Sequence, residues 1–302
     1  MIDPRALRTY LAVCRAGSIS AAARVLCLSQ PSVSVAIAQL EHQLGAVLFE
    51  RKRSGVVRTP AGEALLRQAE AMDGLLREAH REVALARDGI HGPLRVGGTP
   101  GALVSLLPEA LSRLERADVK LAARVVERPD SSLVDLLRRR EIELAFVTTG
   151  LETPPADITE RGCVRDPFDL VVGRAHDHLP EVVALREVSH LPWVLPDAVG
   201  AFRRQVDALF MAADVPVPPD VIRCDSLLTT KALVRAGRHV TVLPRRVAAA
   251  ELSIGVLRAV RLTDVAMERT VGVRYLRDVA LSEGARLLLA ELPSLDPIHS
   301  PV

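Results

Sequence analysis

The sequence contains few aromatic residues and no long apolar run. Aromatic side chains make up 3% of its 302 residues, with one Trp, two Tyr and five Phe, so we expect an interior built from aliphatic side chains. No stretch of about 18 uninterrupted apolar residues occurs, which excludes a transmembrane helix of ordinary length. The N-terminus carries Asp3, Arg5 and Arg8 where a secretion signal needs an apolar run. We therefore expect a cytoplasmic protein with no membrane partner.

The four cysteines are scattered along the chain and form no CxxC pair. This spacing offers neither a zinc-binding nor a redox motif. Cys14 and Cys27 fall among the apolar positions of predicted helices, so we interpret the cysteines as buried free thiols. A redox switch built from Cys163 and Cys224 is the alternative, although these two lie on separate predicted elements. The sequence predicts no metal site and no cofactor.

Length and composition predict a folded protein of two domains. Hydrophobic residues make up 49% and charged residues 25% of the chain, which excludes disorder. Domains near 150 residues are usual, so this length predicts two. The net charge is only +2, but residues 1–60 contain eight Lys or Arg against three acids, a balance of +5 that leaves −3 for the rest. The N-terminal part is therefore the candidate for binding a polyanion.

Three short helices are predicted near the N-terminus, because apolar residues recur there at helical spacing with interruptions. They span about 4–15, 18–27 and 29–44, with Ser18 and Ser29 placed to cap the second and third. Two helices joined by a very short turn, the second beginning with small polar side chains, are typical of a helix-turn-helix.

A hairpin and a long helix are predicted to follow. Residues 47–59 place apolar residues around a basic Ser-Gly turn, which indicates a short wing. Pro60 then begins a helix to about Asp88, roughly 40 Å long at 1.5 Å per residue. Its apolar residues recur at alternating steps of four and three, which favours pairing with a second chain, the alternative being packing on its own domain. The predicted dimerisation residues are Leu65, Ala69, Met72, Leu76, Ala79 and Val83.

From residue 94 onward, β-rich runs alternate with helical ones, which indicates a mostly parallel sheet with helices on both faces. The expected strands are 94–97, 119–126, 143–148, 168–172, 193–195, 221–224, 239–243 and 270–275. The expected helices are 102–116, 131–140, 201–212, 227–236 and 282–292.

The segment SQPSVSVAIAQLEHQLG, the LFER that follows it and the later RTPAGEALL resemble the DNA-binding signature of LysR-type transcriptional regulators. Further along, LVRAGRHVTVLP is similar to a glycine-containing helix-to-strand segment of that family. The resemblance implies an all-α winged helix-turn-helix in residues 1–59, a linker helix in 60–90 and an α/β regulatory domain with the periplasmic-binding-protein fold in 91–302.

The same resemblance implies how the regulatory domain divides and what the protein binds. Subdomain one takes residues 91–162 and 267–302, subdomain two takes 163–266, and the two crossing strands fall near 160–165 and 265–269. The implied partners are a double-stranded DNA operator, a small-molecule effector and further copies of the chain in a dimer or tetramer. Contact with RNA polymerase is left open.

The start of the third helix is predicted to read DNA bases. Pro31 leaves Gln30, Ser32 and Ser34 projecting from the end that enters a major groove, where Gln can bond two atoms of an adenine edge. Val35 departs from the family pattern, since many relatives carry a basic residue there. Its methyl groups can touch a thymine methyl but make no hydrogen bond.

The basic wing is predicted to contact phosphates or the minor groove, the alternative being a solvated charged loop. Ser18 and Ser20 are equally well explained as helix caps or as phosphate contacts. The predicted DNA-binding residues are Ser18, Ser20, Ser29, Gln30, Pro31, Ser32, Ser34, Val35, Gln39, Arg51, Lys52, Arg53 and Arg58.

The effector is expected between the subdomains, where strand ends and helix N-termini bring free backbone N–H groups together. Hydroxyl-bearing or glycine residues stand at four such turns; singly each is an ordinary cap, and their convergence favours a pocket. Arg203 or Arg204 could supply a positive charge for a carboxylate ligand. The predicted effector-binding residues are Thr99, Pro100, Gly101, Thr148, Thr149, Gly200, Phe202, Arg203, Ser226 and Thr229.

An enzyme is the rival interpretation of the C-terminal part. Its best local candidate is the run His176, Asp177 and His178, which lies in a predicted loop without a third ligand at metal-binding spacing. We interpret this run as a solvent-exposed polar turn. The sequence therefore predicts no catalytic residues and no enzyme.

Overall fold

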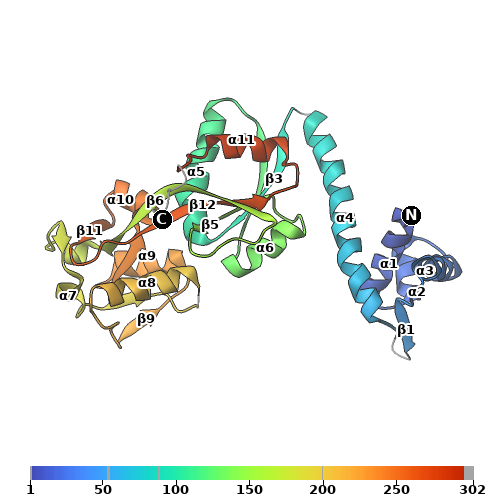
Figure 1. Cartoon of the computed structure of the whole chain (residues 1–302), viewed down its shortest axis with the longest axis horizontal. Coiled ribbons are helices and arrows are strands. Elements are labelled where there is room, and N and C mark those ends of the chain that lie inside the picture. Colours follow the sequence, from blue (N-terminus) through green and yellow to red (C-terminus); the bar gives the residue numbers. More distant parts are fainter. Residues whose placement is uncertain (1, 53–54, 88, 199, 296–302) are drawn as a thin grey trace. The chain divides into compact units, whose positions relative to one another are not determined.

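The computed structural model describes residues 2–52, 55–87, 89–198 and 200–295, and the chain divides into two compact units, residues 1–84 and 85–302. Figure 1 shows both units, with the helices and many of the strands labelled. The first unit contains α1 (Pro4–Ala16), α2 (Ile19–Leu26), α3 (Gln30–Leu44), β1 (Phe49–Lys52), β2 (Gly55–Arg58) and most of α4 (Pro60–Arg87). The three predicted helices, the hairpin and the long helix are thus confirmed.

Helices α1 to α3 begin and end at their capping residues. The side chains of Asp3, Ser18 and Ser29 accept backbone N–H bonds at the three N-termini, which satisfies donors that have no partner inside a helix. Gly17 and Gly45 follow α1 and α3 with φ angles of 69° and 63°, a left-handed conformation that glycine adopts without strain. The short turns of the helix-turn-helix therefore follow from local sequence.

Tyr10 joins α1, β1 and α4 in one core. Its side chain is fully buried, its ring centroid lies 5.1 Å from that of Phe49, and its hydroxyl donates to the Gly62 carbonyl oxygen at 2.6 Å. Burial raises the pKa of the Tyr10 hydroxyl above its usual value, so the group stays protonated and remains a donor.

The beginning of α4 packs on its own unit. Ala69 has no exposed surface, and Leu65 and Met72 pack against the same core. The predicted dimer seam is therefore wrong at Ala69, because the core of its own chain already covers that side chain. The seam residues outside this core are Leu76, Ala79 and Val83.

The second unit contains one mixed sheet with helices around it. Its strands are β3 (His91–Gly98), β4 (Leu121–Glu127), β5 (Leu144–Thr149), β6 (Ile158–Val172), β7 (Val182–Val183), β8 (Trp193–Leu195), β9 (Val221–Arg223), β10 (Val240–Pro244), β11 (Arg258–Leu262) and β12 (Glu268–Leu276). Its helices are α5 (Pro100–Arg116), α6 (Asp130–Arg138), α7 (Leu185–Val188), α8 (Ala201–Ala212), α9 (Leu227–Ala236), α10 (Ala249–Ser253) and α11 (Glu283–Glu291), with 3₁₀ turns η1 (Arg174–His176) and η2 (Arg245–Ala248).

Every predicted strand and helix of this unit is present. The sequence missed β7, β11, α7 and α10, each of which has five residues or fewer. The strand order is β4-β3-β5-β12-β6-β10-β8-β9, with β11 beside β6 and β7 beside β11. Pairs among β3, β4 and β5 and among β8, β9 and β10 are parallel, whereas β6 runs antiparallel to β12, β10 and β11.

Strand β6 is common to two halves of the sheet (Figure 1). Residues 158–167 pair with β12, and residues 168–172 pair with β10 on one side and β11 on the other. We call the half with β3, β4, β5 and β12 the first subdomain and the half with β8, β9, β10 and β11 the second. The predicted boundary after residue 162 falls inside β6, before this exchange of partners.

Helices cover both faces of each half of the sheet, as predicted. All six residues of β5 are buried; Leu144 and Phe146 join the core with α5 and α11, whereas Ala145 and Val147 join the core with α6. This division follows from the alternation of side chains along a strand. In the second subdomain α8 packs over one face, and α9 and α10 lie over the other.

A buried ion pair lies where β6 and β12 cross between the halves. Arg269 of β12 donates to Asp166 of β6 through Nη2 at 3.0 Å, and both side chains are buried. The same Nη2 donates to the Gly101 carbonyl oxygen and to Ser105 Oγ, each at 3.1 Å. The backbone N–H of Arg246 in η2 donates to the other oxygen of Asp166 at 2.9 Å. One carboxylate and one guanidinium thus join β6, β12, α5 and η2.

We expect Arg269→Leu to lower the free energy of unfolding of the second unit by about 3–5 kcal/mol, because Asp166 keeps a buried charge without a partner. Urea unfolding followed by the fluorescence of Trp193, the single Trp, measures the loss. Adding Asp166→Asn to the same chain should recover part of it, since the charge is removed and the acceptor for Arg246 is kept. If Arg269→Leu alone is as stable as the parent, the ion pair between Arg269 and Asp166 does not have this structural role.

Candidate DNA interface and effector site

The N-terminal end of α3 presents small polar side chains to solvent. Ser29, Gln30 and Ser32 are exposed, whereas Val33 and Ile37 on the opposite face are buried in the core of the first unit. Polar groups at the free end of a helix that is held by its apolar face can reach the edges of bases in a groove.

Several of the predicted DNA contacts also bond to one another. Ser20 of α2 donates to Gln30 Oε1 at 3.2 Å, a bond that ties the two helices and orients the amide. Ser18 and Ser29 are caps: Ser29 Oγ accepts from the Ser32 backbone N–H and lies 2.7 Å from Ser32 Oγ. The remaining predicted contacts on α3 are Pro31 in the first turn, partly buried Ser34, Val35 with 54% of its surface exposed, and exposed Gln39.

Among the basic residues of the wing, the structure describes the side chain of Arg58. Arg51 and Lys52 lie in β1, opposite Val56 and Gly55, but their side chains and the whole of Arg53 lie outside the described residues. Arg58 Nε donates to Glu63 Oε1 at 2.6 Å, and this bond raises the pKa of Arg58. Arg58 therefore ties the wing to α4.

Glu41 anchors the wing to α3, a role that sequence reasoning missed. Its Oε1 accepts the backbone N–H of Leu48 at 2.7 Å and of Phe49 at 3.3 Å. The wing is fastened again at its far strand, where the Val56 N–H donates to the Gly17 carbonyl oxygen at 3.0 Å. The sequence signal for this role was Glu41 itself, an acidic residue in the Leu-Glu-x-x-Leu-Gly segment that ends α3 shortly before the hairpin.

The predicted effector residues of the first subdomain lie together at its strand ends. The Thr99 N–H donates to the Phe146 carbonyl oxygen, and Thr149 Oγ1 donates to the carbonyl oxygen of Thr270. Gly101 approaches Arg269 so closely that a Cβ there would lie 3.1 Å from Nη1. Pro100 follows Thr99 in the first turn of α5, and Thr148 is 9% exposed. Thr99 stands at the N-cap of α5, yet its hydroxyl makes no capping bond.

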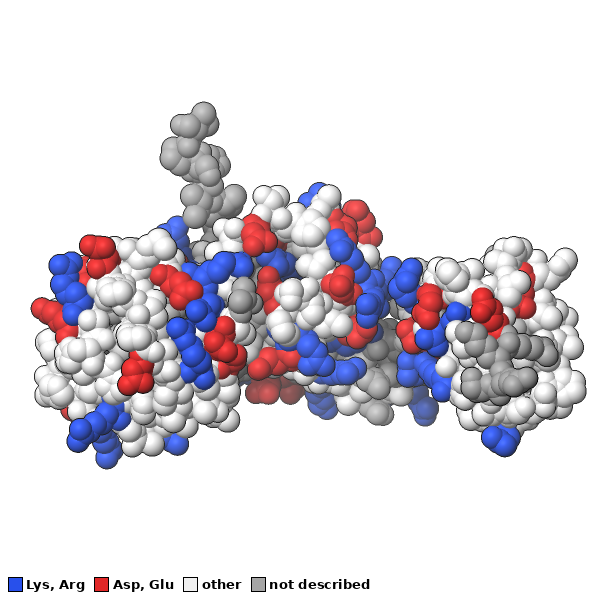
Figure 2. Space-filling view, turned by 90° about the horizontal axis from the view of Figure 1, so that it is seen from below, with Lys and Arg blue, Asp and Glu red and all other residues white. Residues whose placement is uncertain are grey.

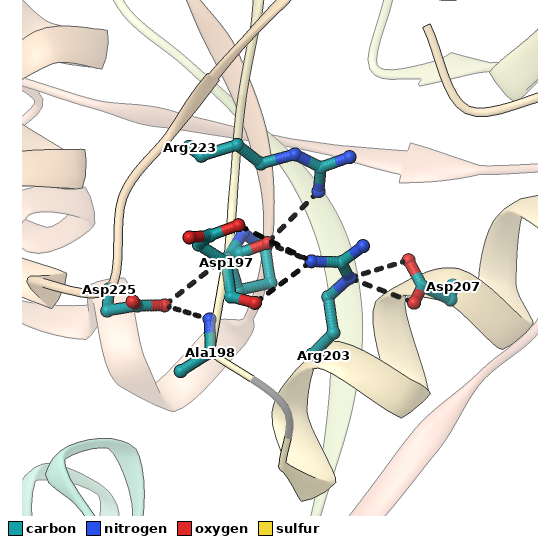
Figure 3. A network of polar contacts seen from close by, with 7 residues as sticks. Asp197, Ala198, Arg203, Asp207, Arg223 and Asp225 are labelled. Carbon is teal, nitrogen blue, oxygen red and sulfur yellow. Dashed lines mark hydrogen bonds and ion pairs between the residues drawn. The ribbon is translucent and has the colours of Figure 1, made fainter. Parts of the chain in front are cut away.

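In the second subdomain, polar contacts hold the loop before α8 (Figure 3). The Asp225 carboxylate accepts the N–H groups of Asp197 and Ala198 at 2.9 and 2.7 Å. Arg223 Nη1 donates to the Pro196 carbonyl oxygen at 3.0 Å. Arg203 Nη1 donates to the carbonyl oxygens of Pro196 and Asp197. The loop is therefore positioned by three side chains from different elements.

Three of the residues predicted to bind effector also have partners within the chain. Arg203 Nε donates to the Asp207 carboxylate at 2.9 Å, so its charge is already balanced. Phe202 stacks on Phe168, with 6.4 Å between ring centroids. Ser226 caps α9, where it accepts from the backbone and hydroxyl of Thr229. Gly200, at the N-cap of α8, has open space where a Cβ would stand.

An ion pair links the strand-end loops of the two subdomains. Arg204, in the first turn of α8, donates to Glu152 at 3.2 Å, and Glu152 follows β5 by three residues. The loop after Thr149 and the start of α8 therefore face each other. Both side chains are mostly exposed, so this bond is a weak one.

The rival site at His176 is structural. His176 is buried, contrary to the solvent-exposed turn we expected, and its Nε2 lies 2.7 Å from the Arg238 carbonyl oxygen. Asp177 and His178 beside it are exposed. Within the described ranges, no three His, Cys, Asp or Glu side chains gather as metal ligands.

The cysteines differ from one another in burial. Cys163 is buried as predicted, and burial raises the pKa of its thiol. Cys27 is exposed, contrary to expectation, because it ends α2 in a left-handed conformation with φ of 54°. Cys14 and Cys224 are partly buried.

Charges of both signs alternate over the second unit on the face drawn in Figure 2. The described surface on that face carries charges of both signs. Residues 1–60 have an excess of positive charge, so the first unit remains the candidate for binding a polyanion. Among the described residues, no single helix is long and apolar enough to span a membrane; α2 and α3 would qualify only as a pair, and they are bent by 109° at their junction.

Two family models match the chain in the order of its two units. Residues 4–63 match the bacterial regulatory helix-turn-helix protein of the lysR family, and residues 87–295 match the LysR substrate binding domain. The chain belongs to the LysR family of transcriptional regulators. It is therefore a DNA-binding regulator with an effector-binding domain, and its family consists of regulators rather than enzymes.

Relatives and solved structures agree with this membership. The chain is 26% identical to the uncharacterized regulator YdcI of Escherichia coli over 94% of its own length and 93% of that protein. It is 32% identical to a probable hydrogen peroxide-inducible genes activator of Mycobacterium leprae, over 81% and 78%. Full-length CbnR in complex with its target DNA superposes with a TM-score of 0.68 at 22% identity, over 96% of this chain and 99% of that one. This last likeness shows the fold of a LysR regulator.

We expect Glu41→Ala to destabilise the LysR wing by about 1.5–3 kcal/mol, because two backbone donors lose a charged acceptor. Hydrogen-exchange mass spectrometry of the full chain measures the change as faster exchange in peptides that cover β1 and β2. Exposed Gln39→Ala on the same helix is the control and should leave exchange unaltered. Unchanged protection of the wing in Glu41→Ala would refute the anchoring role.

Proposed function

We propose that the first unit recognises a specific operator through the N-terminal end of α3, and that a small-molecule effector bound between the two subdomains controls this binding. The observation that carries the first part is the exposed polar end of α3, where Gln30 is held by Ser20. A glutamine oriented by a neighbour loses less rotamer freedom when it pairs with a base edge.

The effector site is supported by hydroxyls and backbone donors rather than by charge. The Thr99 hydroxyl has no bonding partner among the described residues, and it stands at a helix N-terminus beside the end of β5. The nearby guanidinium groups are already paired, Arg203 with Asp207 and Arg269 with Asp166. We therefore place Thr99, Thr148 and Thr149 at the ligand and reassign Ser226 and Thr229 to capping.

Self-association is proposed through the part of α4 that its own core leaves uncovered. Leu75 and Val83 are 43% and 65% exposed, and aliphatic side chains exposed along one helix favour a partner helix. The seam would then run through Leu76, Ala79 and Val83. Assembly of dimers into a tetramer and contact with RNA polymerase stay predictions from the family.

Oxidation sensing is the rival control mechanism, raised by the name of the Mycobacterium leprae relative. A sensing thiol must ionise readily. Burial instead raises the pKa of Cys163 and of Cys14. The partly buried Cys224 donates its Sγ hydrogen to the Ser226 carbonyl oxygen. These features favour a bound ligand over Cys14, Cys163 or Cys224 as the control element.

We expect Gln30→Ala to cost about 1–3 kcal/mol on the best operator and to flatten its sequence preference, because no amide remains to read a base edge. Fluorescence anisotropy with operator and random duplexes measures both effects. Ser20→Ala is the matched control, since it removes the bond to Gln30 and keeps the amide, and it should cost clearly less. Equal losses on operator and random DNA for Gln30→Ala would remove this residue from base readout.

We expect Thr99→Val to abolish the effector response and to leave basal operator binding near the parent value. Coupling of about 1–3 kcal/mol between effector and operator corresponds to a five- to 150-fold change in affinity. A thermal-shift screen of small carboxylates, amino acids and aromatic acids identifies a ligand, and calorimetry compares the variants. Ser226→Ala is the control and should lower stability while keeping binding. A ligand that binds Thr99→Val as tightly as the parent does not occupy the proposed site.

A further inference from the structure

A cavity of about 610 Å³ opens in the second subdomain, away from the proposed effector site. Its lining comes from the end of β6, η1, η2, α10 and β11, and Figure 1 shows α10 and β11 in this half of the sheet. None of the residues predicted to bind effector belongs to the lining. The cavity is large enough for a ligand of a few to a dozen non-hydrogen atoms.

The cavity combines an aliphatic wall with an excess of positive charge. Val172, Leu252 and Leu257 contribute to the wall. Arg174, Arg245 and Arg258 also line the cavity, against the single acid Asp177. An apolar wall beside three guanidinium groups matches a ligand that has an aliphatic body and one anionic end.

Two of the three arginines are held in place by the protein. Arg258 donates through Nη1 and Nη2 to the carbonyl oxygens of Pro180, His176 and Leu179, while its buried Nε has no partner among the described residues. Arg245 Nε lies 2.9 Å from the carboxylate of buried Asp169.

Arg174 differs from these two arginines because it is exposed. Its side chain forms no ion pair with any described residue. Arg174 therefore has its full hydrogen-bonding capacity available for an anion.

We propose that this cavity is a second ligand site, which binds a small organic carboxylate with an aliphatic body. Arg174 pairs with the carboxylate, and the body lies against Leu252 and Leu257. This inference goes beyond the effector site between the subdomains and does not depend on it.

The second site is connected to the crossing strands by the segment 245–249. Arg245 and Ala249 line the cavity. Between them, the Arg246 N–H donates to Asp166, and Val247 packs against Gly101, where a Cβ would lie 3.3 Å from Val247 Cγ2. A ligand that displaces this segment acts on the ion pair at the crossing, so the site is placed to bias the two subdomains.

Isothermal titration calorimetry of the full chain with cyclohexanecarboxylate tests the proposal, with cyclohexanecarboxamide and acetate as probes that lack the charge or the body. Arg174→Ala should weaken carboxylate binding about tenfold or more, because a charge-assisted hydrogen bond is lost. Arg235→Ala, an exposed arginine of the same subdomain that does not line the cavity, should bind like the parent.

A substitution that fills the cavity provides a second test of the proposal. Ala249→Trp should abolish binding, whereas Ala250→Trp, the exposed neighbour outside the lining, should keep it; circular dichroism and melting temperature verify that both variants fold. Thr99→Val should leave this binding unchanged, which separates it from the effector site. No binding to the parent, or equal affinity for parent and Ala249→Trp, would overturn the second site.

Discussion

The pairing of β6 with β12 decides how the regulatory domain is built, and Asp166 and Arg269 stand at its centre. A buried carboxylate and guanidinium are costly to desolvate, and here each is compensated by further bonds to Ser105, the Gly101 carbonyl oxygen and the Arg246 N–H. Because one ion pair holds both strands together with α5 and η2, a shift of one subdomain against the other must strain or rearrange it. The domain is thereby suited to a small set of discrete arrangements.

In the DNA-binding unit, hydrogen bonds between side chains and the backbone hold the helices and the wing in place. Ser18 and Ser29 cap their helices, and Tyr10 fastens α4 to α1. Glu41 holds the wing against α3. These contacts leave the polar end of α3 exposed, while Val33 and Ile37 on its opposite face are buried. A rigid support with an unoccupied polar end is what specific recognition of a groove requires.

The sequence predicted the helices and strands more accurately than it predicted which side chains contact one another. Periodicity and caps placed α1 to α3, α8 and α9 within one or two residues, because those signals are local. It assigned Arg203 to a ligand and Ala69 to a second chain. The structure pairs Arg203 with Asp207 and buries Ala69 in its own core, since a side chain's partner depends on which elements the fold brings beside it.

The sequence by itself determined the family, the order of the two units and most of their helices and strands, because motifs, helical periods and capping residues are written along the chain. Only the tertiary structure decided that the Thr99 hydroxyl bonds to none of the described residues, and that Glu41 anchors the wing. It alone brought Arg174, Arg245 and Arg258 around one cavity. Arg174 is distant in sequence from Arg245 and Arg258, and such neighbours are set by the packing of whole elements rather than by any local pattern.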